Sequence, residues 1–269
     1  MQKVKPKKAL GQHFLTDLSV ARRIAATLSE YRNLPVVEVG PGMGVLTQFL
    51  ISEGHDLKVA EIDGESVDYL RESYPELAAE GRIIEGDFLK MDLAELFPGH
   101  DKFCVIGNYP YNISSQIFFH VLDYKDSVEC CSGMLQREVA ERLAAPAGTK
   151  ARGILSVLLQ AWYDVDYLFT VDEHVFNPPP KVKSGVIRMV RNKVTDLGCD
   201  ERLFKTVVKT TFGQRRKTIR NSVRGLLPAG LTVADSPLMA MRPEQLSVEQ
   251  FISLTNLISD LRDKSGVNQ

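Results

Sequence analysis

The chain has 269 residues, of which 44% are hydrophobic and 25% are charged, and its formal net charge is -1. These values are ordinary for a globular protein that buries its own core, and they exclude a disordered chain. No apolar run approaches the length of a membrane span, so we expect no membrane partner.

The N-terminus is basic, with four lysines among its first eight residues (Met1–Lys8). Such a start resembles a signal peptide, but the following Ala9–His13 interrupts any apolar stretch, so we expect a cytoplasmic protein. The cysteines lack the paired spacing of zinc sites and predict reduced core thiols without a metal: Cys104, Cys130, Cys131 and Cys199.

Between Val36 and Val190, short β-branched runs alternate with helix-like stretches, which predicts a doubly wound, mostly parallel α/β sheet. Only the short, proline-rich Phe176–Lys183 separates the last two strands, so no crossover helix fits and the final strand should be antiparallel. The predicted strands are Val36–Val39, Lys58–Ile62, Arg82–Glu85, Phe103–Ile106, Ser127–Met134, Tyr163–Val171 and Gly185–Arg191.

Helical periodicity replaces the β-branched runs after Asn192–Gly198. We therefore predict a first domain over residues 1–195, with a basic N-terminal arm, and a small helical cap over residues 196–269. The predicted helices of the cap are Leu203–Phe212, Arg216–Leu227 and Val248–Leu261.

A glycine-rich turn follows the first predicted strand, with glycine at positions 40, 42 and 44. A dinucleotide fingerprint would have its third glycine at position 45, where this chain has Val45. The spacing resembles the first motif of S-adenosylmethionine-dependent methyltransferases instead, so Gly40 and Gly42 are expected cofactor contacts. A turn that merely packs a helix on a sheet has a similar composition, so this motif alone does not decide.

Acidic residues end the next two strands at the same edge of the predicted sheet. Glu61 comes about 20 residues after the glycine turn, where a carboxylate can accept both hydroxyls of a ribose. Asp87 ends the third strand, and an acceptor there suits an adenine amino group, although Asp after Gly is also ordinary turn chemistry. Open α/β sheets bind ligands at this edge, which favours the ribose role for Glu61.

The fourth strand leads into Gly107–Tyr111, which resembles the Asn-Leu-Pro-Tyr motif of adenine-amine methyltransferases, with Tyr109 in place of Leu. The adenine amine is a poor nucleophile because its lone pair is delocalised into the ring, so catalysis must come from positioning. The side-chain oxygen of Asn108 and the carbonyl of Pro110 can accept the two amine hydrogens, and Tyr111 can stack on the base. Without the resemblance, a proline turn with two core tyrosines would explain the segment equally well.

The near-neutral total charge conceals a second basic region between Arg202 and Arg224. A basic helix is often only a solvated surface. This one contains three consecutive cations, which favours contacts with RNA phosphates; the expected contacts are Arg215, Arg216, Lys217 and Arg220.

Ordered motifs over nearly the whole chain resemble the small-subunit (16S) rRNA adenine N6,N6-dimethyltransferase family. The family usually has Asn where this chain has His13. The matching segments are Lys8–Leu15, Gln136–Arg142, Phe176–Ser184, Phe212–Asn221 and Arg242–Ser247.

This resemblance implies a Rossmann-like fold, S-adenosylmethionine as cofactor, and Phe176 stacking on a target base drawn out of its stack. Its implied substrate is two adjacent adenosines in a hairpin loop near the 3' end of 16S rRNA, each dimethylated at the amine, within a small-subunit assembly intermediate. We expect a monomer. The implied cofactor contacts are His13, Leu15, Gly40, Glu61, Asp87 and Asn108.

Two other functions remain open. A resistance-type methyltransferase of large-subunit (23S) rRNA shares the catalytic motifs, but Arg242–Ser247 and the long Phe176 motif favour the small-subunit group. A ribosome-assembly or transcription factor can keep the fold and bind nucleic acid without catalysis. Such a factor has no need of intact Glu61, Asp87 and Asn108.

Overall fold

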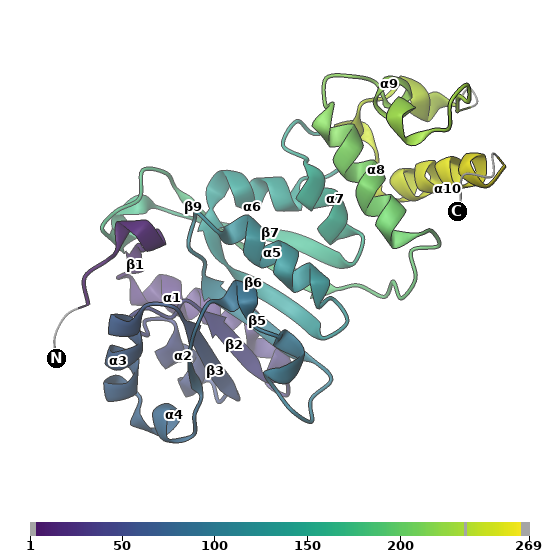
Figure 1. Cartoon of the computed structure of the whole chain (residues 1–269). Helices are drawn as coiled ribbons and strands as arrows, with labels where there is room; N and C mark the ends of the chain where they lie inside the picture. Colours follow the sequence, from purple (N-terminus) through teal and green to yellow (C-terminus); the bar gives the residue numbers. More distant parts are fainter. Residues whose placement is uncertain (1–3, 234–235, 265–269) are drawn as a thin grey trace. The chain divides into compact units, whose positions relative to one another are not determined.

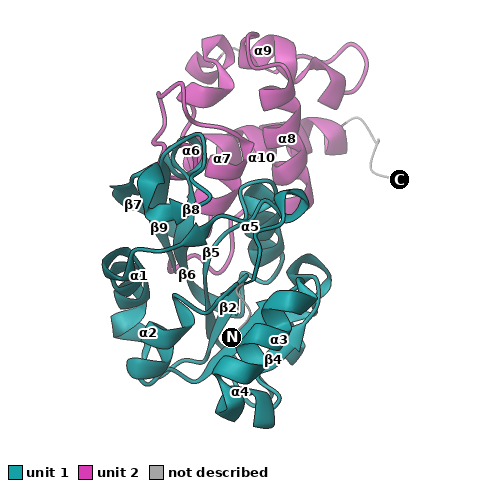
Figure 2. Ribbon diagram, turned by 90° about the vertical axis from the view of Figure 1, so that its left-hand side faces the viewer, with its two compact units in different colours: residues 1–141, 164–191 teal, residues 142–163, 192–269 magenta. Residues whose placement is uncertain are grey.

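A computed structural model describes residues 4–233 and 236–264 of the chain. It divides into two compact units (Figure 2): residues 1–141 with 164–191, and residues 142–163 with 192–269. The domain boundary near residue 196 stays a prediction; the chain enters the second unit for good at residue 192, having already contributed residues 142–163 to it. Within the described ranges, no helix is both long and apolar enough to cross a membrane.

The first unit is built on a seven-stranded sheet of order β4-β3-β2-β5-β6-β9-β7. Figure 1 labels most of these strands. Every pairing among strands β2 to β6 is parallel, whereas β9 is antiparallel to β6, which confirms the predicted direction of the last strand. All seven predicted strands are present, with ends within two residues of the prediction. They are β2 (Val36–Val39), β3 (Leu57–Glu61), β4 (Ile83–Glu85), β5 (Phe103–Asn108), β6 (Val128–Gln136), β7 (Tyr163–Val171) and β9 (Ser184–Arg191).

Helices cover both faces of this sheet, as in a doubly wound fold. On one face, α1 (Leu18–Ala25), α2 (Thr47–Ser52) and α3 (Gly64–Ser73) share a hydrophobic cluster with alternate strand residues. On the other face, α5 (Ser114–Asp123) packs against β6. The short α4 (Pro75–Ala79) follows α3, and α6 (Arg137–Ala144) follows β6 directly.

Local sequence explains where these helices begin. The side chain of Asp17 caps α1 by accepting hydrogen bonds from the backbone N–H groups of Ser19 and Val20. Val20 and Ile24, four residues apart, then face the same core and are buried.

A two-stranded antiparallel ribbon that the sequence did not indicate joins the N-terminal arm to the proline-rich segment. Strand β1 (Phe14–Leu15) pairs with β8 (Phe176–Asn177), with Leu15 opposite Phe176. The N–H of Thr16 extends the ribbon by donating to the carbonyl of Val175 (2.8 Å). The ribbon fixes the arm at the edge of the sheet where the strands β2 to β5 end.

The second unit is helical, with α7 (Ile154–Gln160), α8 (Glu201–Gly213), α9 (Ile219–Ser222) and α10 (Val248–Lys264). Phe212 of α8 stacks on Phe251 of α10, with ring centroids 6.1 Å apart. Arg152 of this unit is also buried, at 1% exposed, and one of its guanidinium nitrogens donates to the carbonyl of Ala145 and to Gln160.

The prediction of one helix over residues 216–227 was wrong. The segment forms only the four-residue α9 and a short 3-10 turn at Arg224–Leu226. Its short polar side chains compete for backbone and local hydrogen bonds, which disfavours a continuous helix. Asn221 donates to the hydroxyl of Thr218 (3.3 Å), and Gly225 adds a further weak helix former.

Candidate active site

One pocket of the first unit lies where the parallel strands end. Gly40 follows β2, Glu61 ends β3, Asp87 follows β4 and Asn108 ends β5, and all four line this pocket. The convergence follows from the parallel arrangement, because the carboxyl ends of these strands meet at one edge of the sheet. Every predicted cofactor contact lies in this lining: His13, Leu15, Gly40, Gly42, Glu61, Asp87 and Asn108.

The glycine turn adopts a conformation that few other residues tolerate. Gly40, Gly42 and Gly44 have φ values of 66°, 56° and 73°. A β-carbon on Gly42 would lie 2.9 Å from the ring of Phe14, so the N-terminal arm packs directly on the turn. The hydroxyl of Tyr74 donates to the carbonyl of Gly44 (2.9 Å) and holds the end of the turn.

Glu61 is 4% exposed and is bound by backbone groups. One carboxylate oxygen accepts from the N–H groups of Ile62 and Asp63, and the other accepts from the N–H of Gly42, each at 3.0 Å. Burial raises the pKa of Glu61, while these three hydrogen bonds oppose the shift. A carboxylate has about four acceptor positions, so one ribose hydroxyl can bind here without displacing a backbone group.

Glu38 is a pocket residue that the sequence interpretation missed. It lies within β2, is 1% exposed, and accepts a hydrogen bond from the hydroxyl of Thr47 (2.6 Å). Burial raises its pKa to about 8, and the nearby Glu61 adds to the shift. An acidic residue among the three valines of β2 was the available signal, because a buried strand seldom contains a charge.

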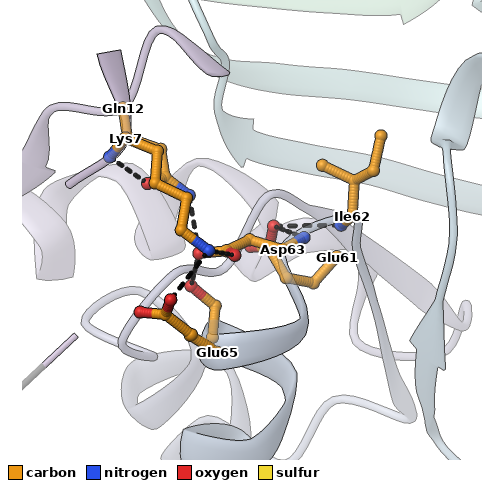
Figure 3. A network of polar contacts seen from close by, with 7 residues as sticks. Lys7, Gln12, Glu61, Ile62, Asp63 and Glu65 are labelled. Carbon is orange, nitrogen blue, oxygen red and sulfur yellow. Dashed lines mark hydrogen bonds and ion pairs between the residues drawn. The ribbon is translucent and has the colours of Figure 1, made fainter. Parts of the chain in front are cut away.

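The N-terminal arm is tied to the loop after β3 by an ionic contact that the sequence also did not reveal (Figure 3). The Lys7 ammonium contacts the carboxylate of Asp63, whose side chain is 2% exposed, and lies 3.1 Å from Glu65. Gln12 bridges the contact: its side chain donates to Asp63 (3.3 Å) and accepts from the N–H of Lys7 (2.8 Å). Burial opposes ionisation of Asp63, but hydrogen bonds from Lys7, Gln12 and Ser66 prevail and lower its pKa.

The turn after β5 presents the acceptors predicted for the adenine amine. The side-chain nitrogen of Asn108 donates to the carbonyl of His13 (3.1 Å), so the amide is oriented with its oxygen as the remaining acceptor. The carbonyl of Pro110 accepts from the N–H of Ile113 (3.2 Å) and keeps a second lone pair. Both residues line the pocket.

The two proposed stacking residues differ in accessibility. Tyr111 lines the pocket, its hydroxyl lies 2.5 Å from that of Ser184, and its ring lies 5.5 Å from the ring of His13. Phe176 is 4% exposed within the hydrophobic cluster and is not among the residues that line the pocket. Stacking of Phe176 on a base therefore stays a prediction.

His13, at the position where the family usually has Asn, lines the pocket and also contacts the proline-rich segment. Its Nδ1 lies 2.8 Å from the carbonyl of Pro178, so the ring helps to join the arm to the proline-rich segment. Because a carbonyl accepts hydrogen bonds, this contact requires a proton on Nδ1.

The predicted RNA contacts lie in the second unit, around the turn after α8. Arg216, Lys217 and Arg220 are exposed. Arg215 instead contacts its own unit: its Nε lies 3.8 Å from Glu244, and another guanidinium nitrogen donates to the carbonyl of Lys150.

No cluster of three or more His, Cys, Asp or Glu side chains in the described part of the chain is arranged to hold a metal ion.

Comparisons with known proteins give consistent results. A profile of the family described as ribosomal RNA adenine dimethylase matches residues 3–260. Ribosomal RNA small subunit methyltransferase A of Porphyromonas gingivalis is 67% identical over 258 residues, covering 96% of this chain and 99% of that protein. The Cytophaga hutchinsonii protein of the same name is 53% identical over 261 residues, covering 96% of this chain and 99% of its own length.

Two solved structures are similar over most of their length. A dimethyladenosine transferase from Plasmodium falciparum has a TM-score of 0.73, with coverage of 94% of this chain and 98% of that one; at 20% identity it shows the fold alone. The 23S rRNA methyltransferase ErmE has a TM-score of 0.64 at 26% identity, with coverage of 91% and 99%.

Proposed function

Because the chain belongs to the ribosomal RNA adenine dimethylase family, we propose that it dimethylates the N6 amines of two adjacent adenosines in a hairpin loop near the 3' end of 16S rRNA. The chain is an S-adenosylmethionine-dependent methyltransferase. The observation that supports the proposed reaction best is the meeting of Glu61, Asp87 and Asn108 in one pocket at the carboxyl edge of the sheet.

The pocket residues fit S-adenosylmethionine. Glu61 retains one acceptor position for a ribose hydroxyl, and the side chain of Asp87 lies at the same edge for the adenine amine of the cofactor. The turn at Gly40–Gly44 offers backbone without side chains. When bound, this cofactor supplies an electrophilic methyl group.

The chain's own contribution to the chemistry is to hold the target amine. In the first transfer, the oxygen of Asn108 and the carbonyl of Pro110 accept its two hydrogens, which draws the nitrogen toward a tetrahedral shape and localises its lone pair. In the second transfer the amine has one hydrogen left, and one of the two acceptors binds it. Tyr111 supplies a face for the base. These contacts form fully only as the methyl transfers, so they lower the barrier rather than strengthen binding.

The RNA partner of this reaction is a small-subunit assembly intermediate, and the protein acts on it as a cytoplasmic monomer. Support for the ribosomal partner comes from the relatives named for the small subunit. The exposed cations Arg216, Lys217 and Arg220 supply phosphate contacts. Four free cysteines suit a reducing compartment.

The alternative function, methylation of 23S rRNA, is supported by the structural similarity to ErmE. The relatives named for the small subunit are far more similar, at 67% identity against 26%. A binding factor without catalysis is disfavoured because Asn108 lines the same pocket as Glu61 and Asp87.

Incubation with labelled S-adenosylmethionine and ribosomal subunits from an unmethylated strain tests the proposal. We expect label at two adjacent adenosines of 16S rRNA, recovered as dimethyladenosine. Label on 23S rRNA would support the alternative function, methylation of 23S rRNA. No label on either RNA would support a binding factor without catalysis.

A further inference from the structure

Tyr109 belongs to the turn that holds the amine acceptors, but its side chain is buried against the sheet. It is 1% exposed, and its hydroxyl donates to the carbonyl of Ser132 (2.7 Å). The hydroxyl also lies 3.3 Å from the sulfur of Cys131, and the N–H of Tyr109 donates to the carbonyl of Met134 (2.9 Å). Backbone and side chain of this one residue therefore bind β6 on both sides of Gly133.

The ring of Tyr109 occupies space that two glycines leave open. Gly107 and Gly133 are register partners in β5 and β6. A β-carbon on Gly133 would lie 2.6 Å from the ring, and one on Gly107 would lie 3.1 Å from it. Phe118 of α5 packs edge-to-face at 5.4 Å. Close packing around an aromatic ring leaves it little freedom, so its hydroxyl reaches a fixed point.

The acceptor of this hydrogen bond is itself immobilised. The hydroxyl of Ser132 donates to the carbonyl of Ile187 in β9 (2.9 Å) and accepts from the hydroxyl of Thr27 (2.7 Å). Ser132 has no exposed surface. Burial raises the pKa of Tyr109 well above its ordinary value, so its hydroxyl keeps the proton that it donates.

We propose that the hydroxyl of Tyr109 is a positioning group for methyl transfer, because its bond to Ser132 fixes the turn on which Asn108 and Pro110 present their acceptors. The inference rests on the proposed function. The Asn-Leu-Pro-Tyr motif has no hydroxyl at this position, so the hydrogen bond to Ser132 is a feature of this chain and not of the motif. Small displacements of positioning groups are costly, since an error of about 1 Å can slow a reaction about 100-fold.

Tyr109→Phe tests the proposal because it keeps the ring and removes only the hydroxyl. With saturating S-adenosylmethionine and unmethylated small subunits, we expect the single-turnover rate to fall about tenfold while both affinities change less than about twofold. Tyr167→Phe is the matched control, because it removes a hydroxyl bonded to Thr170 on β7 (2.6 Å). Ile24→Val in the α1 core controls for a general loss of stability.

Hydrogen exchange provides a second measurement that does not depend on activity. In Tyr109→Phe we expect faster exchange in residues 108–113 and unchanged exchange in β6. Tyr109→Met, which also fills the space without a hydroxyl, gives the same comparison if Tyr109→Phe does not fold.

The outcomes separate this inference from the proposed function. An inactive wild-type protein would contradict the proposed function. Hydrogen exchange would then still test whether the hydroxyl of Tyr109 fixes the turn. A Tyr109→Phe rate within about twofold of wild type, or a fall that Ile24→Val reproduces, would overturn the positioning role.

Discussion

The side-chain amide of Asn108 donates a hydrogen bond to the backbone carbonyl of His13, 3.1 Å away. A residue of the N-terminal arm thereby orients the residue that we expect to hold the target amine. The same arm packs Phe14 on the glycine turn and pairs Leu15 with Phe176. Contacts to the glycine turn and to the turn that contains Asn108 thus depend on one short segment.

Lys7→Met should loosen this arm by removing the cation that contacts buried Asp63. Because residues 10–15 line the pocket, we expect S-adenosylmethionine to dissociate several-fold faster, with a smaller effect on the single-turnover rate. Stopped-flow displacement of a fluorescent cofactor analogue measures the dissociation. Lys5→Met, at an exposed position, is the control, and equal dissociation rates in both variants would contradict the expectation.

Glu38 should make the protein less stable as the pH rises. Its folded pKa of about 8 is above the ordinary 4.5, so its favourable contribution is complete below pH 4.5 and is lost as the pH rises through about 8. Between pH 4.5 and about pH 8, the shifted pKa of Glu38 should lower the free energy of unfolding by roughly 1.4 kcal/mol per pH unit. Glu38→Gln resembles the protonated form and keeps an acceptor for Thr47, so its stability should vary less with pH.

Urea unfolding of wild type and Glu38→Gln at pH 6 and pH 8 checks this expectation. Glu76→Gln, at an exposed position, controls for the change of charge. Parallel pH profiles for wild type and Glu38→Gln would show that Glu38 ionises without cost in the folded protein.

The cations in the turn after α8 are of two kinds: Arg216 and Lys217 are exposed, whereas Arg215 contacts its own unit. Arg216→Ala with Lys217→Ala should weaken RNA binding and reduce the slope of log Kd against log salt by about 0.7 to 0.9 for each phosphate that the variant no longer neutralises. Arg215→Ala should also destabilise the second unit, because one oxygen of Glu244 is buried and has no hydrogen-bond partner among the described residues. Fluorescence anisotropy across salt concentrations and thermal unfolding distinguish the two effects. An unchanged salt slope in the double variant would show that these two side chains are only solvated and do not contact RNA phosphates.

The edge of the pocket was predictable from sequence because each strand of a parallel sheet delivers its last residue to the same place. Glu61 and Asp87 were predicted from their positions at strand ends, Asn108 was predicted from the motif that it resembles, and the structure brings all three together. The β1–β8 ribbon was not predictable, because each strand has two residues and no periodicity. Its partners Leu15 and Phe176 are also far apart in the chain.

Long-range polar contacts escaped prediction for a similar reason. Lys7 looked like one of several lysines in a basic arm, and nothing local indicates that it contacts Asp63. Tyr109 lines the pocket, but its contacts were not predictable, because the glycines that accommodate its ring are in two different strands. Such relationships depend on strand register, which composition does not specify.

The role proposed for Asn108 fits its oriented amide, and substitutions there give the sharpest test of the proposed chemistry. Asn108→Ala removes the oxygen acceptor and the bond to His13, so we expect RNA affinity to stay nearly intact while the single-turnover rate falls roughly 100-fold or more. Asn112→Ala, an exposed asparagine in the same turn, is the matched control and should keep a near-normal rate.

Asn108→Asp tests the oxygen that accepts from the amine separately from the hydrogen bond to His13 that orients the side chain. A carboxylate can still accept from the amine, but it cannot donate to the carbonyl of His13, and two oxygens would face each other across the present 3.1 Å contact. Its negative charge would also stabilise the sulfonium ground state, whose charge disperses during transfer. We therefore expect Asn108→Asp to be slow as well, with an N-terminal arm that exchanges hydrogen faster than in wild type. A near-normal single-turnover rate for Asn108→Ala, with saturating cofactor and RNA, would show that Asn108 only terminates β5 and does not hold the amine.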